Sequence, residues 1–370
     1  MPTLHRLASF LPAALLAIAA ACDSDSTGPG GDAPAGGIVV LNGFGQPGVT
    51  LLADTGTAST RIDFGDDFDG AVFNVANDTA VATSSSFGGD KLFVADLGAG
   101  TVETLQLPGG SNPAGAAFVS GEARFAVALR NTGQIALVRR TGTGTAALTL
   151  LDDAGLCPTD VVEFGGSLYS ADANAACAAG TFASQGPARL IRVSRTGAEG
   201  DTIDLPGATG SSATVVVLGS FAYVAVSGEA DFSGTPTFVA SGTVTKVDLV
   251  TGQLAGSVRL PEGTYGAAMR AGADGKLYLA AYTATDFQSR GIFVVTPSSM
   301  AIAGDAAGIP LRRTDGALAN CGAATADAAG NVYCVEDDES GNSTLLVFDA
   351  SGDQVRAVPA GTGGVDVALR

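Results

Sequence analysis

Two adjacent arginines, Arg312 and Arg313, form the most conspicuous charged pair in an acidic chain. The sequence of 370 residues holds 37 Asp and Glu against 19 Lys and Arg, and its formal net charge is −18. Two neighbouring guanidinium groups can hold a carboxylate, phosphate or sulfate by paired hydrogen bonds. Neighbouring side chains of a strand point to opposite faces, so ion pairs with local acids are the alternative. We therefore expect this pair either to capture an anion or to pair locally.

Clustered carboxylates suggest a second chemistry, calcium binding. The two acidic runs are Asp63, Asp66, Asp67 and Asp69, and Asp337, Asp338 and Glu339. An EF-hand loop with Gly70 as its central glycine would need a glutamate where Ala76 stands, so that motif fails. A calcium site of another kind and a solvated acidic turn both remain open. We predict no cofactor, with calcium as the alternative.

Histidine chemistry is almost absent from the chain. The single histidine is His5, inside a segment that we expect to be cleaved. A mature chain without histidine excludes Ser-His-Asp and Cys-His nucleophile systems and histidine-ligated metals. The excess of acids also argues against a nucleic-acid partner, because binding a polyanion requires Lys and Arg.

Four cysteines lie beyond the first segment: Cys157, Cys177, Cys321 and Cys334. An even number in an exported chain indicates disulfides. We pair Cys157 with Cys177 and Cys321 with Cys334, because each pair brackets one predicted hairpin. A four-thiolate metal site is the alternative, although no C-x-x-C spacing supports it.

The first 21 residues are typical of an export signal. A basic start precedes an apolar run over 7–20, which is too short to span a membrane. The ending Ala19-Ala20-Ala21-Cys22 resembles the lipobox of bacterial lipoproteins, which implies a lipid on Cys22. Residues 22–37 are rich in Gly, Ser, Asp and Pro and predict a flexible tether. We expect a lipid-anchored protein of the cell envelope, at the periplasmic face or the cell surface. An ordinary cleaved signal is the alternative.

The body of the chain, residues 38–370, repeats about every 49 residues and is expected to form one domain. Each unit reads as four short strands, which we name a to d, in an antiparallel meander. Strand b often begins with Gly-x-apolar-Tyr, as in GSLY at 166–169, GKLY at 275–278 and GNVY at 330–333. Four strands per unit of this length predict an all-β propeller blade.

The number of blades follows from the complete units and from the strands left over at the two ends of residues 38–370. Six complete units end near residues 108, 153, 206, 261, 310 and 359. One strand at 363–370 and three strands at 38–41, 49–53 and 59–64 are left over, and together they complete another blade. We predict a seven-bladed β-propeller of four-stranded blades, closed by the C-terminal strand joining three N-terminal strands. A sandwich array and rings of six or eight blades are the alternatives.

The turn DLVTG at 248–252, with GKLYLA at 275–280, resembles the YVTN or YncE-like seven-bladed propellers. The resemblance implies the architecture over most of 38–370 and does not imply an activity. Propeller lactonases of the gluconolactonase type use carboxylates and Asn around the channel with calcium. If this chain is similar to these lactonases, Asp160 and Asn320 are the carboxylate and the amide that would serve at the channel with calcium.

Long connections predict where a ligand would bind. In a propeller the b–c and d–a connections share one face, which we call the loop face. Its long b–c connections are 172–187, 228–242, 283–290 and 337–342. Its candidate polar groups are Asp172, Glu229, Asp231, Asp286, Arg290, Arg312, Arg313, Asp315, Asp337 and Asp338. We place Arg312 and Arg313 on a d–a connection close to the axis. Neutral loop drift is the alternative to recognition.

Two functions follow from this sequence. The first is a non-catalytic, monomeric binding module that takes a protein, peptide or small polar ligand at the loop face. The second is a calcium-dependent hydrolase or lactonase with carboxylates at the channel mouth. Converging carboxyl or amide oxygens would favour the second.

Overall fold

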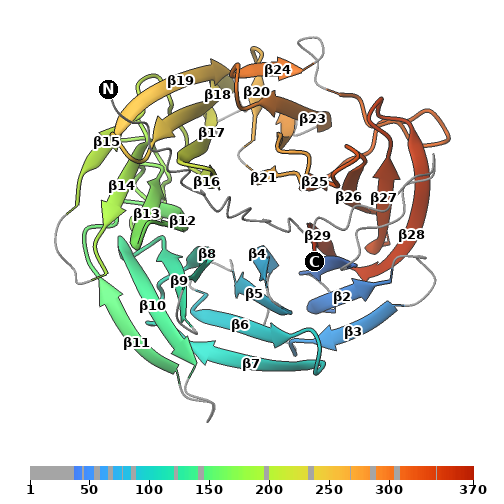
Figure 1. Cartoon of the computed structure of the whole chain (residues 1–370), viewed down its shortest axis with the longest axis horizontal. Helices are drawn as coiled ribbons and strands as arrows, with labels where there is room; N and C mark the ends of the chain where they lie inside the picture. Colours follow the sequence, from blue (N-terminus) through green and yellow to red (C-terminus); the bar gives the residue numbers. More distant parts are fainter. Residues whose placement is uncertain are drawn as a thin grey trace, which may run out of the picture.

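The computed structural model describes residues 37–370, apart from 44–45, 54–58, 66–69, 77, 85–88, 121–123, 141–145, 196–199, 232–236, 267, 284–288, 304–308 and 339. The described residues form strands and connections only, arranged as seven sheets around a central axis (Figure 1). The described part of the chain has no helix that is long and apolar enough to cross a membrane. The predicted seven-bladed propeller is therefore confirmed.

Each sheet is one blade, numbered in chain order with the closing blade last. Blade one holds β4 (Gly70–Ala76), β5 (Thr79–Ser84), β6 (Lys91–Asp96) and β7 (Thr101–Gln106). Blade two holds β8 (Pro113–Val119), β9 (Arg124–Leu129), β10 (Gln134–Arg140) and β11 (Ala146–Leu151). Blade three holds β12 (Pro158–Phe164), β13 (Ser167–Asp172), β14 (Arg189–Val193) and β15 (Thr202–Asp204). Blade four holds β16 (Ala213–Leu218), β17 (Phe221–Asp231), β18 (Thr237–Asp248) and β19 (Gln253–Arg259).

The remaining blades follow the same order from the axis outward. Blade five holds β20 (Thr264–Tyr265), β21 (Met269–Ala271), β22 (Leu277–Thr283), β23 (Ser289–Thr296) and β24 (Ala301–Ala303). Blade six holds β25 (Ala324–Ala326), β26 (Val332–Asp337), β27 (Asn342–Phe348) and β28 (Gln354–Thr362). Blade seven holds β29 (Gly364–Leu369), β1 (Ile38–Asn42), β2 (Gly48–Leu52) and β3 (Ser59–Asp63).

The ring closes where the two ends of the described chain meet. β29 pairs antiparallel with β1, with Ile38 opposite Leu369 and Val40 opposite Val367. The Arg370 amide also donates to the Gly37 carbonyl oxygen at 3.0 Å. The predicted closure is confirmed, because the C-terminal strand and three N-terminal strands share one sheet.

Blade five departs from the four-strand plan because its inner strand is interrupted. β20 and β21 both pair with β22, which makes this sheet five-stranded. At Gly266, between them, an added Cβ would lie 2.5 Å from the Ala280 carbonyl oxygen. Only glycine allows the backbone to approach β22 so closely, so the inner strand is held against the sheet while it changes register.

Recurrent aspartates explain the Gly-x-apolar-Tyr motif at the a–b turns. In blade five the Asp274 carboxylate accepts hydrogen bonds from the Lys276 amide and from the Tyr278 hydroxyl at 2.8 Å. In blade six Asp327 accepts from Asn331 and from the Tyr333 hydroxyl at 3.1 Å. The aspartate, the glycine turn and the tyrosine thus form one unit that joins the inner two strands.

The core lies between blades rather than inside any one of them. For example, Val39 and Leu41 of blade seven pack with Phe73 and Phe93 of blade one in one buried cluster. Val224 of blade four packs in the same way with Leu190 of blade three. Each blade therefore buries its faces against two neighbours, which lets one domain of this length have a continuous core.

Candidate functional site

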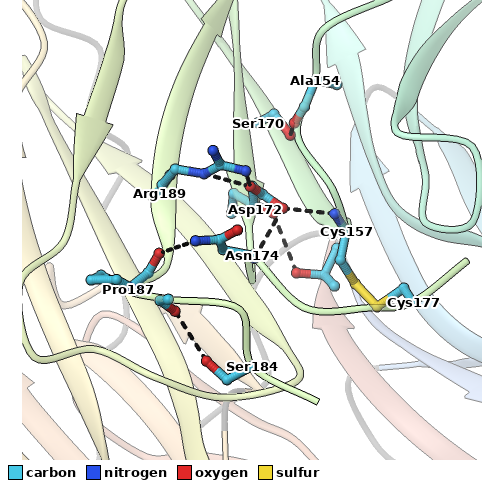
Figure 2. A network of polar contacts seen from close by, with 12 residues as sticks. Ala154, Cys157, Ser170, Asp172, Asn174, Cys177, Ser184, Pro187 and Arg189 are labelled. Atoms are coloured by element: carbon cyan, nitrogen blue, oxygen red, sulfur yellow. Dashed lines mark hydrogen bonds and ion pairs between the residues drawn. A yellow bond between two sulfur atoms is a disulfide. The ribbon is translucent and has the colours of Figure 1, made fainter. Parts of the chain in front are cut away.

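A network of polar contacts holds the long b–c connection of blade three (Figure 2). Asp172 ends β13, is fully buried, and accepts hydrogen bonds from the Cys157 and Asn174 amides at 2.8 and 3.0 Å. Its other oxygen accepts from Nε of Arg189 at 2.8 Å. At Gly155 an added Cβ would lie 2.3 Å from Cγ of Asp172, so only glycine fits there. Every polar contact of Asp172 is therefore used to hold the loop.

Both predicted disulfides are present. Cys157 pairs with Cys177, with Cα atoms 5.5 Å apart, and Cys321 pairs with Cys334, with Cα atoms 5.7 Å apart. The first bond ties the start of blade three to its b–c loop. The second ties the chain before β25 to β26. Both cross-links therefore support the scaffold of the loop face.

The predicted long connection at 228–242 in blade four is mostly a continuation of the two strands where the structure describes it. β17 and β18 continue their pairing as far as Asp231 opposite Thr237. Gly228 allows the two strands to approach closely in this extension, since an added Cβ would meet the Ala240 carbonyl oxygen at 2.6 Å. Asp231 lies exposed at the end of this long hairpin.

Arg312 and Arg313 lie away from the axis, which corrects their predicted position. Residues 311–319 form a small hairpin, and Arg312 also bridges Asp353, next to the outermost strand of blade six. The Arg313 guanidinium lies 3.2 Å from Asp315 and 3.3 Å from Glu336. The d–a connection runs outward along the neighbouring blade before it turns in, so the pair meets local acids.

Arg290 and Asn320, two further predicted ligand-binding residues that the structure describes, lie in different blades and have separate partners. Arg290 donates to the Glu262 carbonyl and to Thr264 Oγ1, both at 2.9 Å. Asn320 is exposed, and its backbone amide donates a hydrogen bond to the Glu336 carboxylate. Asp286 and Cys22 lie outside the described residues.

The two acidic runs shape turns where they are described. Asp63 accepts from the Gly65 amide, Asp337 from Ser343, and Asp338 from Asn342. Asp66, Asp67, Asp69 and Glu339 lie outside the described residues. Among the residues that are described, no three His, Cys, Asp or Glu side chains gather closely enough to hold a metal ion. Calcium binding remains a prediction.

The central channel holds a cavity of about 800 Å³. All seven innermost strands line it, namely β4, β8, β12, β16, β21, β25 and β29 (Figure 1). Its wall is mostly apolar, with Val72, Val162, Val215 and Met269 among its residues. Its loop-face end includes Tyr265 and Tyr282, which lie opposite each other where β20 meets the end of β22.

A charged pair crosses this channel. Arg270 comes from blade five, and its Nε donates to Oδ1 of Asp366 in blade seven at 2.9 Å. Its Nη2 donates to Oδ2 of Asp366 and to the Phe73 carbonyl of blade one. Burial lowers the pKa of Arg270, and Asp366 together with Asp160 raises it by more, so the net direction is upward. This cation is therefore fully compensated and acts as a tie between inner strands.

Asp160, on β12, is the one predicted ligand-binding residue that the structure places in this cavity within the described chain. Its two oxygens accept from the Val161 amide at 2.8 Å and the Val215 amide at 2.9 Å. Burial raises the pKa of Asp160 to about 6, although both amides and Arg270 lower it. The carboxyl group can therefore change charge near neutral pH.

Sequence reasoning missed Arg270 and Asp366. Both lie on innermost strands, and each interrupts a run of apolar residues there. Aligning the repeats strand by strand would have assigned them to the channel. Their partnership links residues 96 positions apart, so no local motif contains it.

No protein-family model and no curated protein matches the chain. Solved structures do. A protein from Lactobacillus plantarum aligns with a TM-score of 0.59 at 15% identity, over 90% of this chain and 98% of its own. Hydrazine synthase from Kuenenia stuttgartiensis gives 0.54 at 13% identity, over 77% and 84%. Dihydro-heme d1 dehydrogenase NirN, in complex with DHE, gives 0.56 at 15% identity, over 93% and 77%.

At these identities the likeness establishes the β-propeller fold alone. Two of these structures are enzymes with different chemistries, so the shared fold does not distinguish a binding module from an enzyme.

Proposed function

We propose that the protein is an envelope-anchored binding module that takes a small ligand into its central channel from the loop face. The observation that carries this proposal is the cavity of about 800 Å³ enclosed by all seven innermost strands. Small-molecule sites in proteins have volumes of about 300–1,000 Å³, mostly apolar walls and a few polar groups. The channel has all three properties.

The character of the wall supports a ligand with an apolar body. Valines and Met269 make up much of the lining, and the Arg270–Asp366 pair is already satisfied. A ligand that lies along this wall removes apolar surface from water, which contributes about 25 cal/mol per Å². Its polar end can then meet Asp160 or the groups near the loop face.

The test uses N-phenyl-1-naphthylamine, a neutral apolar dye whose fluorescence rises when it leaves water. The purified full chain should bind it saturably at one site. Ser212→Trp places an indole in the cavity lining and should abolish this binding. Val250→Trp is the control, because Val250 is 73% exposed on a c–d turn. Equal binding by wild type and Ser212→Trp would contradict the proposal.

We also propose that Cys22 carries the membrane anchor. The support is the lipobox-like sequence, the apolar run before it and the polar residues after it. Metabolic labelling with a palmitate analogue in a bacterial host should mark the wild-type chain and not Cys22→Ala. Labelling of both proteins would exclude this anchor.

A calcium-dependent hydrolase is the second candidate, and Asp160 favours it. A carboxyl group in a cavity with a pKa near 6 is suited to general acid–base work. Calcium should then raise the melting temperature of the wild-type chain, and the protein should hydrolyse a simple lactone with a rate that falls in Asp160→Asn. Neither effect is expected of the binding module.

A further inference from the structure

The mouth of the channel at blade two contains a group of polar atoms without partners. The d–a connection from blade one ends at Ser111 and Asn112, and the b–c turn of blade two begins at Arg130 and Asn131. The two segments are joined by backbone bonds from the Arg130 amide to the Asn112 carbonyl and from the Asn131 amide to the Ser111 carbonyl. They therefore form one rigid corner of the loop face.

Four side-chain atoms of this corner are buried and have no hydrogen-bond partner among the described residues: Ser111 Oγ, Asn112 Oδ1, Arg130 Nε and Asn131 Oδ1. Ser111 and Asn112 are 0% and 2% exposed. A buried polar group that lacks a partner costs about 1–3 kcal/mol. Four such atoms in one corner, two of them able to donate, indicate a site for a polar partner that the described chain does not supply.

Arg130 lies near the loop-face end of the channel. Its guanidinium interacts electrostatically with Tyr265, which lines the cavity at that end. Arg130 belongs to blade two and Tyr265 to blade five, and these blades are not neighbours in the ring. The electrostatic interaction between them therefore runs over the channel mouth, just above the residues that line the cavity.

Within the described part of the chain Arg130 also has no carboxylate partner, in contrast to three other partly buried arginines. Arg189 pairs with Asp172, Arg270 with Asp366, and Arg313 with Asp315 and Glu336. Burial removes water from this guanidinium group, and no described carboxylate replaces that water. Such a cation can bind an anion from solution. Burial lowers the pKa of Arg130 and Tyr265 raises it, and burial has the larger effect.

We propose that Arg130 binds the anionic group of a small organic ligand at the channel mouth, while the apolar body of that ligand occupies the cavity. This inference rests on the proposed function and specifies its ligand class. Carboxylate and phosphate share the required chemistry, since each can accept two hydrogen bonds from the planar guanidinium fork. Of the four unpartnered atoms, Arg130 Nε and Ser111 Oγ can donate to this anion, whereas the Oδ1 atoms of Asn112 and Asn131 are acceptors and do not bind it.

The experiment measures displacement of N-phenyl-1-naphthylamine by four compounds with the same eight-carbon body: octanoate, octyl phosphate, octanol and octylammonium. Wild type should prefer the two anions over octanol and octylammonium. Arg130→Gln should weaken at least one anion about tenfold or more and leave octanol unchanged. The anion that loses more in Arg130→Gln identifies the headgroup. Arg139→Gln is the matched control, because Arg139 is exposed on β10 of the same blade.

Two results would overturn the inference. One is equal displacement by the anions from wild type and Arg130→Gln. The other is displacement by octanol or octylammonium as tight as that by octanoate and octyl phosphate. If the dye still binds wild type and not Ser212→Trp, the proposed function stands and only the anion site fails. Should Arg130→Gln not fold, Arg130→Lys, which keeps the charge and loses the fork, should weaken octanoate severalfold.

Discussion

Arg189 and Arg130 occupy comparable places on the loop face, and they differ in what surrounds them. Arg189 begins β14 of blade three and meets the buried carboxylate of Asp172, which also holds two backbone amides. Arg130 follows β9 of blade two, and none of the described carboxylates pairs with it. Both side chains are partly buried.

The contrast between these two arginines distinguishes a residue that supports the scaffold from one that is available to bind a ligand. A buried charge that is matched within the chain fixes a loop and has no capacity left for a ligand. A buried charge that is unmatched does not stabilise the fold, and it keeps its hydrogen bonds available for a ligand. Four variants test this distinction, from the largest expected effect to the smallest.

Removing the matched carboxylate should have the largest effect. Asp172→Ala leaves Arg189 unpaired and two amides unsatisfied, so we expect the free energy of unfolding to fall by about 3–5 kcal/mol. Urea denaturation followed by circular dichroism measures it. Asp201→Ala is the control, because its exposed carboxylate lies 3.9 Å from Arg192 and should contribute less than about 1 kcal/mol. Equal losses would remove the distinction between the two kinds of pair.

Opening the disulfide of the same loop should have the next largest effect. Cys157 and Cys177 are 20 residues apart, and loop-closure entropy predicts a loss of about 3 kcal/mol for Cys157→Ala with Cys177→Ala. Dye binding in the channel should survive, because neither cysteine lines the cavity. A variant that stays folded and loses the dye would show that the loop, rather than the channel, forms the site.

The carboxyl group in the channel should make stability depend on pH. Burial raises the folded-state pKa of Asp160 to about 6 from the ordinary 3.8, so the folded protein holds this proton more tightly than the unfolded chain. Its stabilising effect is complete below pH 4 and is lost as the pH rises through 6. Relative to Asp160→Asn, wild type should lose about 2 kcal/mol over this window, because the group is partly open to the cavity. Parallel curves for the two proteins would contradict this.

Removing the unmatched cation should change stability least. Arg130→Gln should alter the free energy of unfolding by less than about 0.5 kcal/mol, or raise it, since no ion pair is broken. Arg189→Gln should lower it by at least about 2 kcal/mol, because Asp172 then keeps a buried charge without its partner. Thermal unfolding of both variants under the same conditions gives the comparison. A large loss in Arg130→Gln would assign that residue to the scaffold.

The fold was predictable from sequence because it depends on periodic features. The strand–turn units, the leftover strands at both ends and the cysteine spacing each have a local pattern, and all three predictions are confirmed. The site was less predictable. The position of Arg312 depends on how far a connection runs outward before returning, which spacing does not encode. The isolation of Arg130 depends on side chains from several blades, including Tyr265, more than a hundred positions along the chain.

The pairing of β1 with β29 also places both ends of the described chain on one face of the ring. β1 begins at Ile38 on the side of the c–d turns and runs toward the loop face, and β29 ends beside it. Gly37 and Arg370 therefore leave the channel mouth uncovered. A fusion partner added after Arg370 would be attached on the face away from Arg130, so a ligand could still approach from the loop face.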